Sequence, residues 1–120
     1  MAGFHHVEIW VADLEQARLE WGWLLARMGF SLESEWLQGQ SWGAGGAYLT
    51  ITTSPNVVDA PHHLAFDAGA AGEVDAIMAD ASAHGWRPLY NERYPHAGGP
   101  AHYAGWLENS AGFKVEVVAG

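Results

Sequence analysis

The sequence predicts an α+β domain of two modules, each with a strand, a helix and two or three further strands, that form a curved sheet with a concave pocket. Two observations carry this prediction. A His-His pair opens two short apolar segments, at His5-His6 and at His62-His63. A stretch of helical periodicity follows each pair and ends near a glycine, Gly29 in one case and Gly85 in the other. Because both landmarks recur at nearly the same offset, we expect two modules of one plan, at about 3–54 and 61–119.

The first module reads as a strand, a helix and further strands. Residues 6–11 alternate between apolar and polar side chains, which is the period of a strand. Asp13 and Gln16 have the spacing of a helix N-cap and its capping-box partner, and Gly29 suits the position just after a helix. The remaining expected elements are short strands at about 30–37 and 47–53, with a glycine-rich turn between them that holds Gly39, Gly43, Gly45 and Gly46.

The second module repeats this order. Residues 63–67 alternate as a strand does, and an apolar stripe at helical spacing runs from Val74 to Ala81. Gly85 is placed to end that helix. The remaining expected elements are strands near 86–93, 101–107 and 113–118, a turn at 109–112, and a connector between the modules at 54–61.

The composition limits the classes of function. With 120 residues, of which 49% are hydrophobic and 16% charged, the chain fits one packed domain. The absence of cysteine excludes disulfides and thiolate metal sites. A net charge of −9 argues against a nucleic-acid partner and suits a neutral or cationic small ligand. No apolar run approaches the roughly 20 residues of a membrane span, and the N-terminus lacks a signal sequence, so we expect a cytoplasmic protein with no membrane partner.

Strand parity sorts the side chains of the predicted sheet onto two faces. Alternate residues of a strand point to opposite faces, and the apolar set must pack against the helices. The opposite face is therefore expected to carry the polar set, which is His6, Glu8, Trp10, Tyr48, Thr50, Thr52, His63, Ala65, Asp67, Lys114, Glu116 and Val118.

Two imidazoles and a carboxylate on this polar face predict a metal site. His6 and His63 occupy matching positions of the two modules, and Glu116 lies on the last strand. Two histidines and one carboxylate with open positions bind Fe(II), Mn(II) or Zn(II). We therefore predict His6, His63 and Glu116 as metal ligands, and Glu116 and Glu8 as the catalytic groups.

Aromatic residues on the polar face favour a ligand pocket over a solvated sheet. A wet polar face is common in antiparallel sheets, but tryptophan and tyrosine there suit a ligand-binding wall. The Gly- and Pro-rich segment 94–103 could form a loop over the pocket mouth. A register slip of one residue would bring His5 and His62 to this face instead. The predicted pocket residues are Trp10, Tyr48, Thr50, Asp67, His102 and Trp106.

Four short motifs follow one another along nearly the whole chain: HVEIWVADL at 6–14, MGF at 28–30, HLAF at 63–66 and ENSAGFKVE at 108–116. Their order and spacing resemble the vicinal-oxygen-chelate superfamily of glyoxalases, bleomycin-resistance proteins, extradiol dioxygenases and fosfomycin-resistance enzymes. The resemblance implies a glyoxalase-like fold of two βαβββ modules that form a curved mixed sheet, usually as a homodimer, and metal ligands at His6, His63 and Glu116. A fourth ligand position of the family falls on Thr50, a poor metal ligand, which implies three ligands here.

These observations lead to one principal functional hypothesis and two alternatives. The principal hypothesis is a divalent-metal-dependent enzyme of lyase, isomerase or dioxygenase type that acts on a small oxygenated or aromatic substrate. The first alternative is a metal-free protein of the bleomycin-resistance type that sequesters a drug or toxin. The second is a structural dimer with a merely solvated polar face. Fosfomycin-type chemistry is not expected, because the chain has a single lysine, Lys114, to hold a phosphonate.

Overall fold

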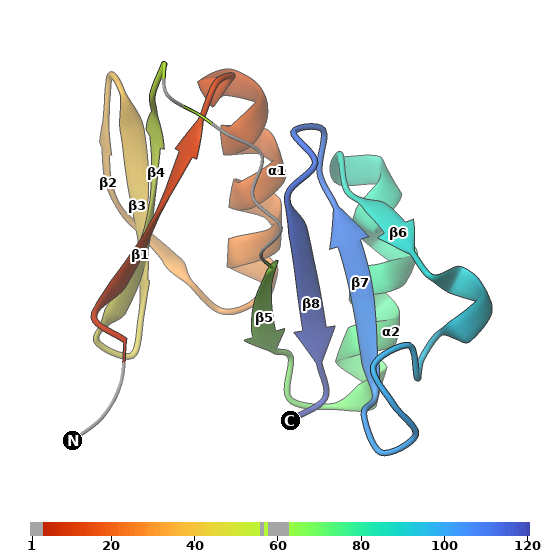
Figure 1. Cartoon of the computed structure of the whole chain (residues 1–120). Helices are drawn as coiled ribbons and strands as arrows, with labels where there is room; N and C mark the ends of the chain where they lie inside the picture. The colour runs from red at the N-terminus through yellow and green to blue at the C-terminus, as the bar shows by residue number, and fades with distance from the viewer. Residues whose placement is uncertain (1–3, 56, 58–62) are drawn as a thin grey trace. The chain divides into compact units, whose positions relative to one another are not determined.

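The computed structural model describes residues 4–55, 57 and 63–120 (Figure 1). The chain divides into two compact units, Met1–Val58 and Asp59–Gly120, and each unit has its own sheet and its own helix. His62 and most of the predicted connector at 54–61 lie outside the described residues.

The first unit is a four-stranded mixed sheet with one helix. The strand order is β1-β4-β3-β2, in which β1 runs parallel to β4 and the other neighbours are antiparallel. The helix α1 packs on β4. The elements are β1 (His6–Val11), α1 (Leu14–Arg27), β2 (Ser31–Trp36), β3 (Gly39–Ala44) and β4 (Ala47–Thr53).

The first helix begins and ends where its sequence predicts. The Asp13 Oδ1 atom accepts a hydrogen bond from the Gln16 backbone N–H at 3.1 Å, as an N-cap does. After the helix, Gly29 has a φ of 89°, in the left-handed region that a helix-ending glycine adopts at low cost. Trp21, Leu24 and Leu25 are fully buried on the face of α1 that covers the sheet. The predicted N-cap and the predicted apolar stripe are confirmed.

The glycine-rich turn predicted between 37 and 47 is wrong for most of its length. Gly39 and Gly43 lie in a strand, β3, and only Gly45 and Gly46 form a turn, both with positive φ. A side chain at Gly39 would meet the carbonyl oxygen of Ile51 on the neighbouring strand. Glycine therefore allows the backbones of two neighbouring strands to approach closely here. A sequence pattern does not distinguish a glycine of this kind from a glycine in a turn.

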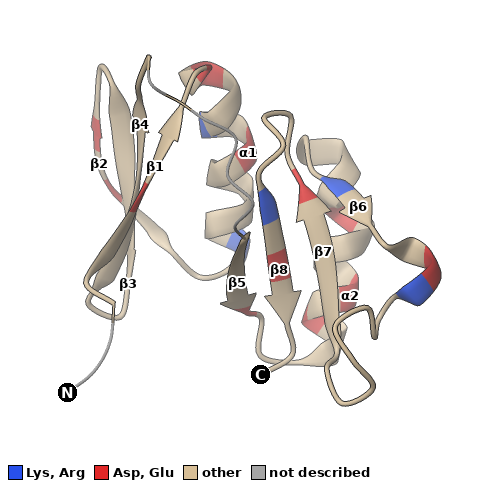
Figure 2. Cartoon of the chain, viewed as in Figure 1, with Lys and Arg blue, Asp and Glu red and all other residues tan. Residues whose placement is uncertain are grey.

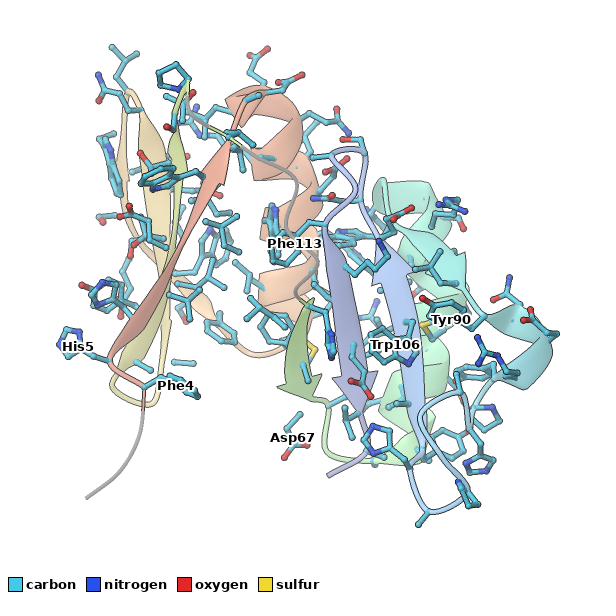
Figure 3. The ribbon with its side chains drawn as sticks, in the orientation of Figure 1. Phe4, His5, Asp67, Tyr90, Trp106 and Phe113 are labelled. Atoms are coloured by element: carbon cyan, nitrogen blue, oxygen red, sulfur yellow. The ribbon has the colours of Figure 1, made fainter. Side chains whose placement is uncertain are left out.

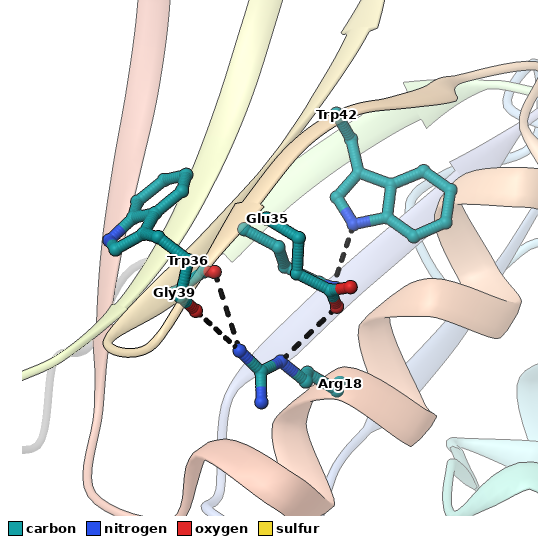
Figure 4. Close-up of polar contacts among 6 residues, drawn as sticks. Arg18, Glu35, Trp36, Gly39 and Trp42 are labelled. Atoms are coloured by element: carbon teal, nitrogen blue, oxygen red, sulfur yellow. Dashed lines mark hydrogen bonds and ion pairs between the residues drawn. The ribbon is translucent and has the colours of Figure 1, made fainter.

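An arginine on α1 holds the β2–β3 hairpin to the helix (Figure 4). Arg18 Nη2 donates to the carbonyl oxygens of Trp36, at 2.8 Å, and Gly39, at 3.4 Å. Its Nε atom lies 3.5 Å from a carboxylate oxygen of Glu35. The two carbonyls flank the turn at residues 37 and 38, so Arg18 fixes the position of that turn against the helix.

The second unit repeats the plan with the order β5-β8-β7-β6. Strand β5 runs parallel to β8, and the other neighbours are antiparallel. The helix α2 packs on β7 and β8. The elements are β5 (His63–Asp67), α2 (Ala71–Asp80), the 3-10 turn η1 (Ala81–His84), β6 (Arg87–Leu89), the 3-10 turn η2 (Asn91–Arg93), β7 (Ala104–Glu108) and β8 (Lys114–Val118).

The second module departs from its prediction in two strands. The strand expected at 101–107 begins only at Ala104. The strand expected at 86–93 ends at Leu89, because Tyr90 adopts a left-handed conformation with a φ of 58° and residues 91–93 form η2. Gly85, with a φ of 85°, ends η1 as expected. The prediction of two βαβββ modules in a glyoxalase-like α+β fold is confirmed, with a shorter second strand, β6, in the second module.

In each unit, apolar side chains of the sheet face that was predicted to pack against the helix are buried. In the first unit the strand contribution to the core comes from Ile9, Val11, Leu49 and Ile51. In the second it comes from Leu107, Val115 and Val117, which pack with Val74 and Ile77 of α2. The polar set is therefore left on the opposite face of each sheet.

Among the described residues, neither helix is both long enough and apolar enough to cross a bilayer.

Candidate functional site

In the first unit, the predicted site residues line up across β1 and β4. The strand register pairs His6 with Tyr48 and Glu8 with Thr50, so all four side chains share one face. The His6 and Tyr48 rings stack with their centroids 4.8 Å apart and their planes 6° apart. His5 lies beside them, with its Nδ1 atom 2.9 Å from Nδ1 of His6.

The other polar groups of this face bond to one another. Trp10 Nε1 donates to Glu8 Oε2 at 2.7 Å, and both side chains are exposed. The hydroxyl oxygens of Thr50 and Ser41 lie 3.2 Å apart and are buried. Since its hydroxyl already has a partner on β3, Thr50 fits a structural role better than that of a fourth metal ligand. Ser41 was not predicted, because its strand was taken for a turn.

In the second unit, Glu116 is a buried carboxylate that two imidazoles contact. Only 7% of its side chain is exposed. The Nε2 atom of His63 lies 3.4 Å from Glu116 Oε1, while the Nε2 atom of His102 contacts Oε2. His63 comes from β5, which adjoins β8 in the sheet, and His102 comes from the segment before β7. The structure therefore brings together three predicted site residues: His63, His102 and Glu116.

An aromatic wall stands beside this carboxylate. Trp106 lies directly opposite Glu116 on the neighbouring strand, and its ring centroid is 4.5 Å from that of His63. Tyr90 follows at a ring distance of 5.8 Å, and Figure 3 shows Tyr90 and Trp106 next to each other. The Nε1 donor of Trp106 is buried, and it has no hydrogen-bond partner among the described residues.

Asp67, the remaining predicted pocket residue, lies at the end of β5 (Figure 3). Its Oδ1 atom accepts a hydrogen bond from the Gly69 backbone N–H at 2.8 Å. This is the geometry by which aspartate closes a turn on its own backbone. This hydrogen bond indicates that Asp67 has a structural role in the turn between β5 and α2.

A carboxylate that sequence reasoning missed lies on α2. Asp75 Oδ1 accepts hydrogen bonds from Tyr103 Oη, at 2.7 Å, and from Tyr94 Oη. The hydrogen bond from Tyr94, followed by that from Tyr103, lowers the pKa of Asp75 below its usual value. Burial, together with the bond to Asp75, raises the pKa of Tyr94, and the bond to Asp75 raises that of Tyr103. The only signal in the sequence was a tyrosine at each end of the segment 94–103.

The donors of the second unit fit a divalent transition metal by their chemistry. Imidazole nitrogen and carboxylate oxygen are the ligands that Fe(II), Mn(II) and Zn(II) accept. His63 and Glu116 supply one of each from neighbouring strands. Within residues 4–55, 57 and 63–120, no three His, Asp or Glu side chains are grouped closely enough to hold an ion. His102 and His63 contact different oxygens of Glu116 and do not converge on one point with it.

Two proteins resemble the chain over nearly its whole length. YqjT of Bacillus subtilis, an uncharacterized protein, is 38% identical over 96% of this chain and 97% of its own. The crystal structure of a presumed glyoxalase from Bacillus halodurans is 36% identical, with a TM-score of 0.89 over 98% of this chain and 95% of that one. No protein-family model matches the chain.

A third protein shares the fold at low identity. It is a mutant of the fosfomycin resistance protein FosX from Listeria monocytogenes, solved with Mn(II) and a dihydroxypropylphosphonic acid. It is 15% identical, with a TM-score of 0.72 over all of this chain and 91% of that one. The paired βαβββ units, the motifs that carry His6, His63 and Glu116, and these likenesses lead to one conclusion. The chain belongs to the vicinal-oxygen-chelate superfamily, alongside glyoxalases.

Proposed function

We propose that the protein is a divalent-metal-dependent enzyme of lyase, isomerase or dioxygenase type that acts on a small oxygenated or aromatic substrate. His6, His63 and Glu116 are its metal ligands. The observation that carries the proposal is Glu116, a carboxylate with 7% of its side chain exposed, which has His63 Nε2 at 3.4 Å from Oε1 and His102 Nε2 in contact with Oε2. A carboxylate is costly to bury without a cationic partner. In the described part of the chain, both Lys114 and Arg87 are paired with Glu108 instead.

The side chains around Glu116 have separate tasks in this proposal. The metal, when bound, supplies a Lewis acid that polarises a substrate oxygen. The ring of Trp106 gives a planar substrate a surface to lie against, and its buried Nε1–H is a free donor for a substrate oxygen. Glu8, exposed on the face that carries His6, is the proposed base that takes a substrate proton.

The phosphonate ligand of FosX is a poor guide to the substrate here. A phosphonate is recognised by cationic side chains. The single lysine, Lys114, lies 3.0 Å from the carboxylate of Glu108, which also pairs with Arg87. Both cations are therefore already paired with a carboxylate, and the chain as a whole has a net charge of −9, so we expect an uncharged or cationic substrate. The Mn(II) of FosX supports the choice of metal only through the shared fold.

Metal binding tests the proposal directly. Untagged protein purified without chelators is titrated with Mn(II) and Zn(II) by calorimetry, and the wild type is compared with His6→Ala, His63→Ala and Glu116→Gln. We expect one ion per chain and a loss of affinity of at least about 10-fold in each variant. His84→Ala, an exposed histidine on η1, is the matched control and should bind as the wild type does. Absence of binding by the wild type would exclude the metal-dependent function.

A second candidate function is metal-free sequestration of a drug or toxin. The exposed aromatic face of the first unit favours it, because Trp10 is 51% exposed and lies on the same face as the stacked His6 and Tyr48. Quenching of tryptophan fluorescence by a drug with a planar aromatic part, such as the bithiazole of bleomycin, tests this function when it is measured with EDTA present. If the protein sequesters the drug, quenching should occur at low drug concentration, persist in His6→Ala and weaken in Trp10→Ala.

A homodimer is part of both proposals, since the resemblance implies one. Sedimentation velocity at several protein concentrations measures the mass in solution. A mass equal to that of one chain, 13.0 kDa, at every concentration would exclude the dimer.

A further inference from the structure

We propose that Asp75 is a positioning residue for Glu116. Through Tyr94 and Tyr103 it holds segment 94–103 in the conformation that places His102 on one oxygen of Glu116. The predicted effect on metal affinity rests on the proposed function, whereas the positioning itself is a property of the metal-free protein.

The first step is the anchor between the segment and the helix. Tyr94 and Tyr103, at the two ends of the segment, both donate to the same oxygen, Oδ1 of Asp75. Asp75 lies in the middle of α2, whose own backbone is fixed by packing on β7 and β8. A single helix residue therefore ties both ends of the segment to the rigid part of the unit. The lowered pKa of Asp75 has the same cause and keeps the acceptor ionised at neutral pH.

The second step is the internal order of the segment. Backbone N–H groups donate to carbonyls within it, from Gly99 to His96 at 3.1 Å, from His102 to Gly99 at 3.1 Å, and from Ala104 to Pro95 at 2.9 Å. The Nδ1 atom of His96 also lies 3.1 Å from the backbone oxygen of His102. The segment is thus a series of closed turns, so we expect a change at its anchor to reach His102.

The third step is the orientation of the His102 ring. The ring lies against the backbone of Gly98, where an added Cβ would be 2.6 Å from Cδ2 of His102. Glycine at this position leaves the space that the imidazole occupies. With the ring seated there, its Nε2 atom reaches Oε2 of Glu116.

The consequence concerns the two oxygens of Glu116. Oε2 is taken by His102, which leaves Oε1 to face His63 at 3.4 Å. A carboxylate held in this way presents one chosen oxygen to an ion beside His63. Hydrogen-bond partners that orient metal ligands typically change metal affinity by about 10- to 100-fold when they are removed.

The test breaks the anchor in two independent ways. Asp75→Ala removes the acceptor, and the double variant Tyr94→Phe/Tyr103→Phe removes both donors without touching the helix. Asp75→Asn keeps a side-chain oxygen and serves as the conservative rescue. His84→Ala is the control. Crystal structures of the metal-free proteins, and the ¹⁵N shifts of the His102 ring, report whether His102 remains on Glu116.

We expect the contact in the wild type, in Asp75→Asn and in His84→Ala, and its loss in Asp75→Ala and in the double tyrosine variant. Mn(II) affinity, measured by calorimetry, should fall about 10- to 100-fold in the two anchor-breaking variants and in His102→Ala. If His102 stays on Glu116 when the anchor is broken, the inference is overturned whatever the metal result. If the wild type binds no Mn(II) while the contact still depends on the anchor, the proposed function fails and the positioning role stands.

Discussion

The Nε2 atom of His63 lies 3.4 Å from Oε1 of Glu116, although the strand register pairs His63 with Lys114 and Ala65 with Glu116. The two residues are diagonal neighbours on adjacent parallel strands, with their side chains on the same face. At this separation only long side chains can meet. The small side chain of Ala65, directly opposite Glu116, leaves the space across which His63 reaches it.

Substitution by alanine at two glycines of β3 should change the stability of the protein by different amounts. Gly39→Ala places a Cβ against the backbone carbonyl of Ile51, which cannot move without disturbing β4. We expect a loss of about 1–3 kcal/mol in the free energy of unfolding, as overpacking typically costs. In Gly43→Ala the Cβ meets the carboxylate end of Glu33, a flexible side chain that can swing away.

Urea unfolding of the two glycine variants, followed by circular dichroism, checks this prediction. The midpoint of Gly43→Ala should lie close to that of the wild type. Equal losses of stability in both variants would contradict the prediction. They would show that the backbone of β3, and not the group that each added Cβ meets, determines the change in the free energy of unfolding.

Trp21 and Trp36 should differ sharply in their contribution to stability. Trp21 is fully buried between α1 and its sheet, whereas Trp36 on β2 is 38% exposed. Removal of a buried aromatic ring costs about 3–5 kcal/mol. We expect a loss of this size for Trp21→Ala and a clearly smaller one for Trp36→Ala, measured by thermal and urea unfolding. Comparable losses would contradict the described core of the first unit.

The two helices offer a matched pair of cap substitutions. α1 has a side-chain N-cap in Asp13. The N-cap position of α2 is Ala70, whose extended backbone suits a cap but whose side chain cannot accept a hydrogen bond. Asp13→Ala should destabilise the protein by about 1 kcal/mol. Ala70→Ser should stabilise it by about 0.5–1 kcal/mol. Thermal unfolding at neutral pH measures both, and a loss of stability in Ala70→Ser would contradict the prediction.

An acidic and a basic segment lie side by side where β7 ends and β8 begins (Figure 2), and the ion pair there predicts a pH-dependent contribution to stability. Lys114 Nζ lies 3.0 Å from Glu108 Oε2, and Lys114, followed by Arg87, lowers the pKa of Glu108 below its usual value of 4.5. A lowered folded-state pKa stabilises the protein above the unfolded-state pKa, and this stabilisation is lost as the pH falls through the folded value.

Lys114→Met should therefore unfold at a lower urea concentration than the wild type at pH 7. The difference between the two midpoints should shrink as the pH is lowered below about 4.5, where Glu108 becomes protonated. Arg27→Met, a change of equal charge on α1, is the control. A difference that is constant from pH 7 to pH 3 would rule out Glu108 as the group responsible.

The family resemblance implied the paired βαβββ fold, whereas the strand period, the helix caps and the repeated histidine pair predicted two modules, each with a strand, a helix and further strands. They succeeded because they are local: alternation along β1, the spacing from Asp13 to Gln16 and the glycine after each helix act within a few residues. The same local logic failed at β3. Gly39 is glycine because of Ile51, twelve residues away in sequence, and no pattern around Gly39 carries that information.

The candidate site also contains residues that local patterns predicted and residues that they did not. Parity along the strands put His63, Glu116 and Trp106 on one face, because the direction of a side chain on a strand follows from its position alone. Only the tertiary structure decided that His102 contacts Glu116 and that Asp75 anchors the segment that carries it. Those contacts join a loop to a strand and a helix, and their distances depend on how the chain folds back on itself.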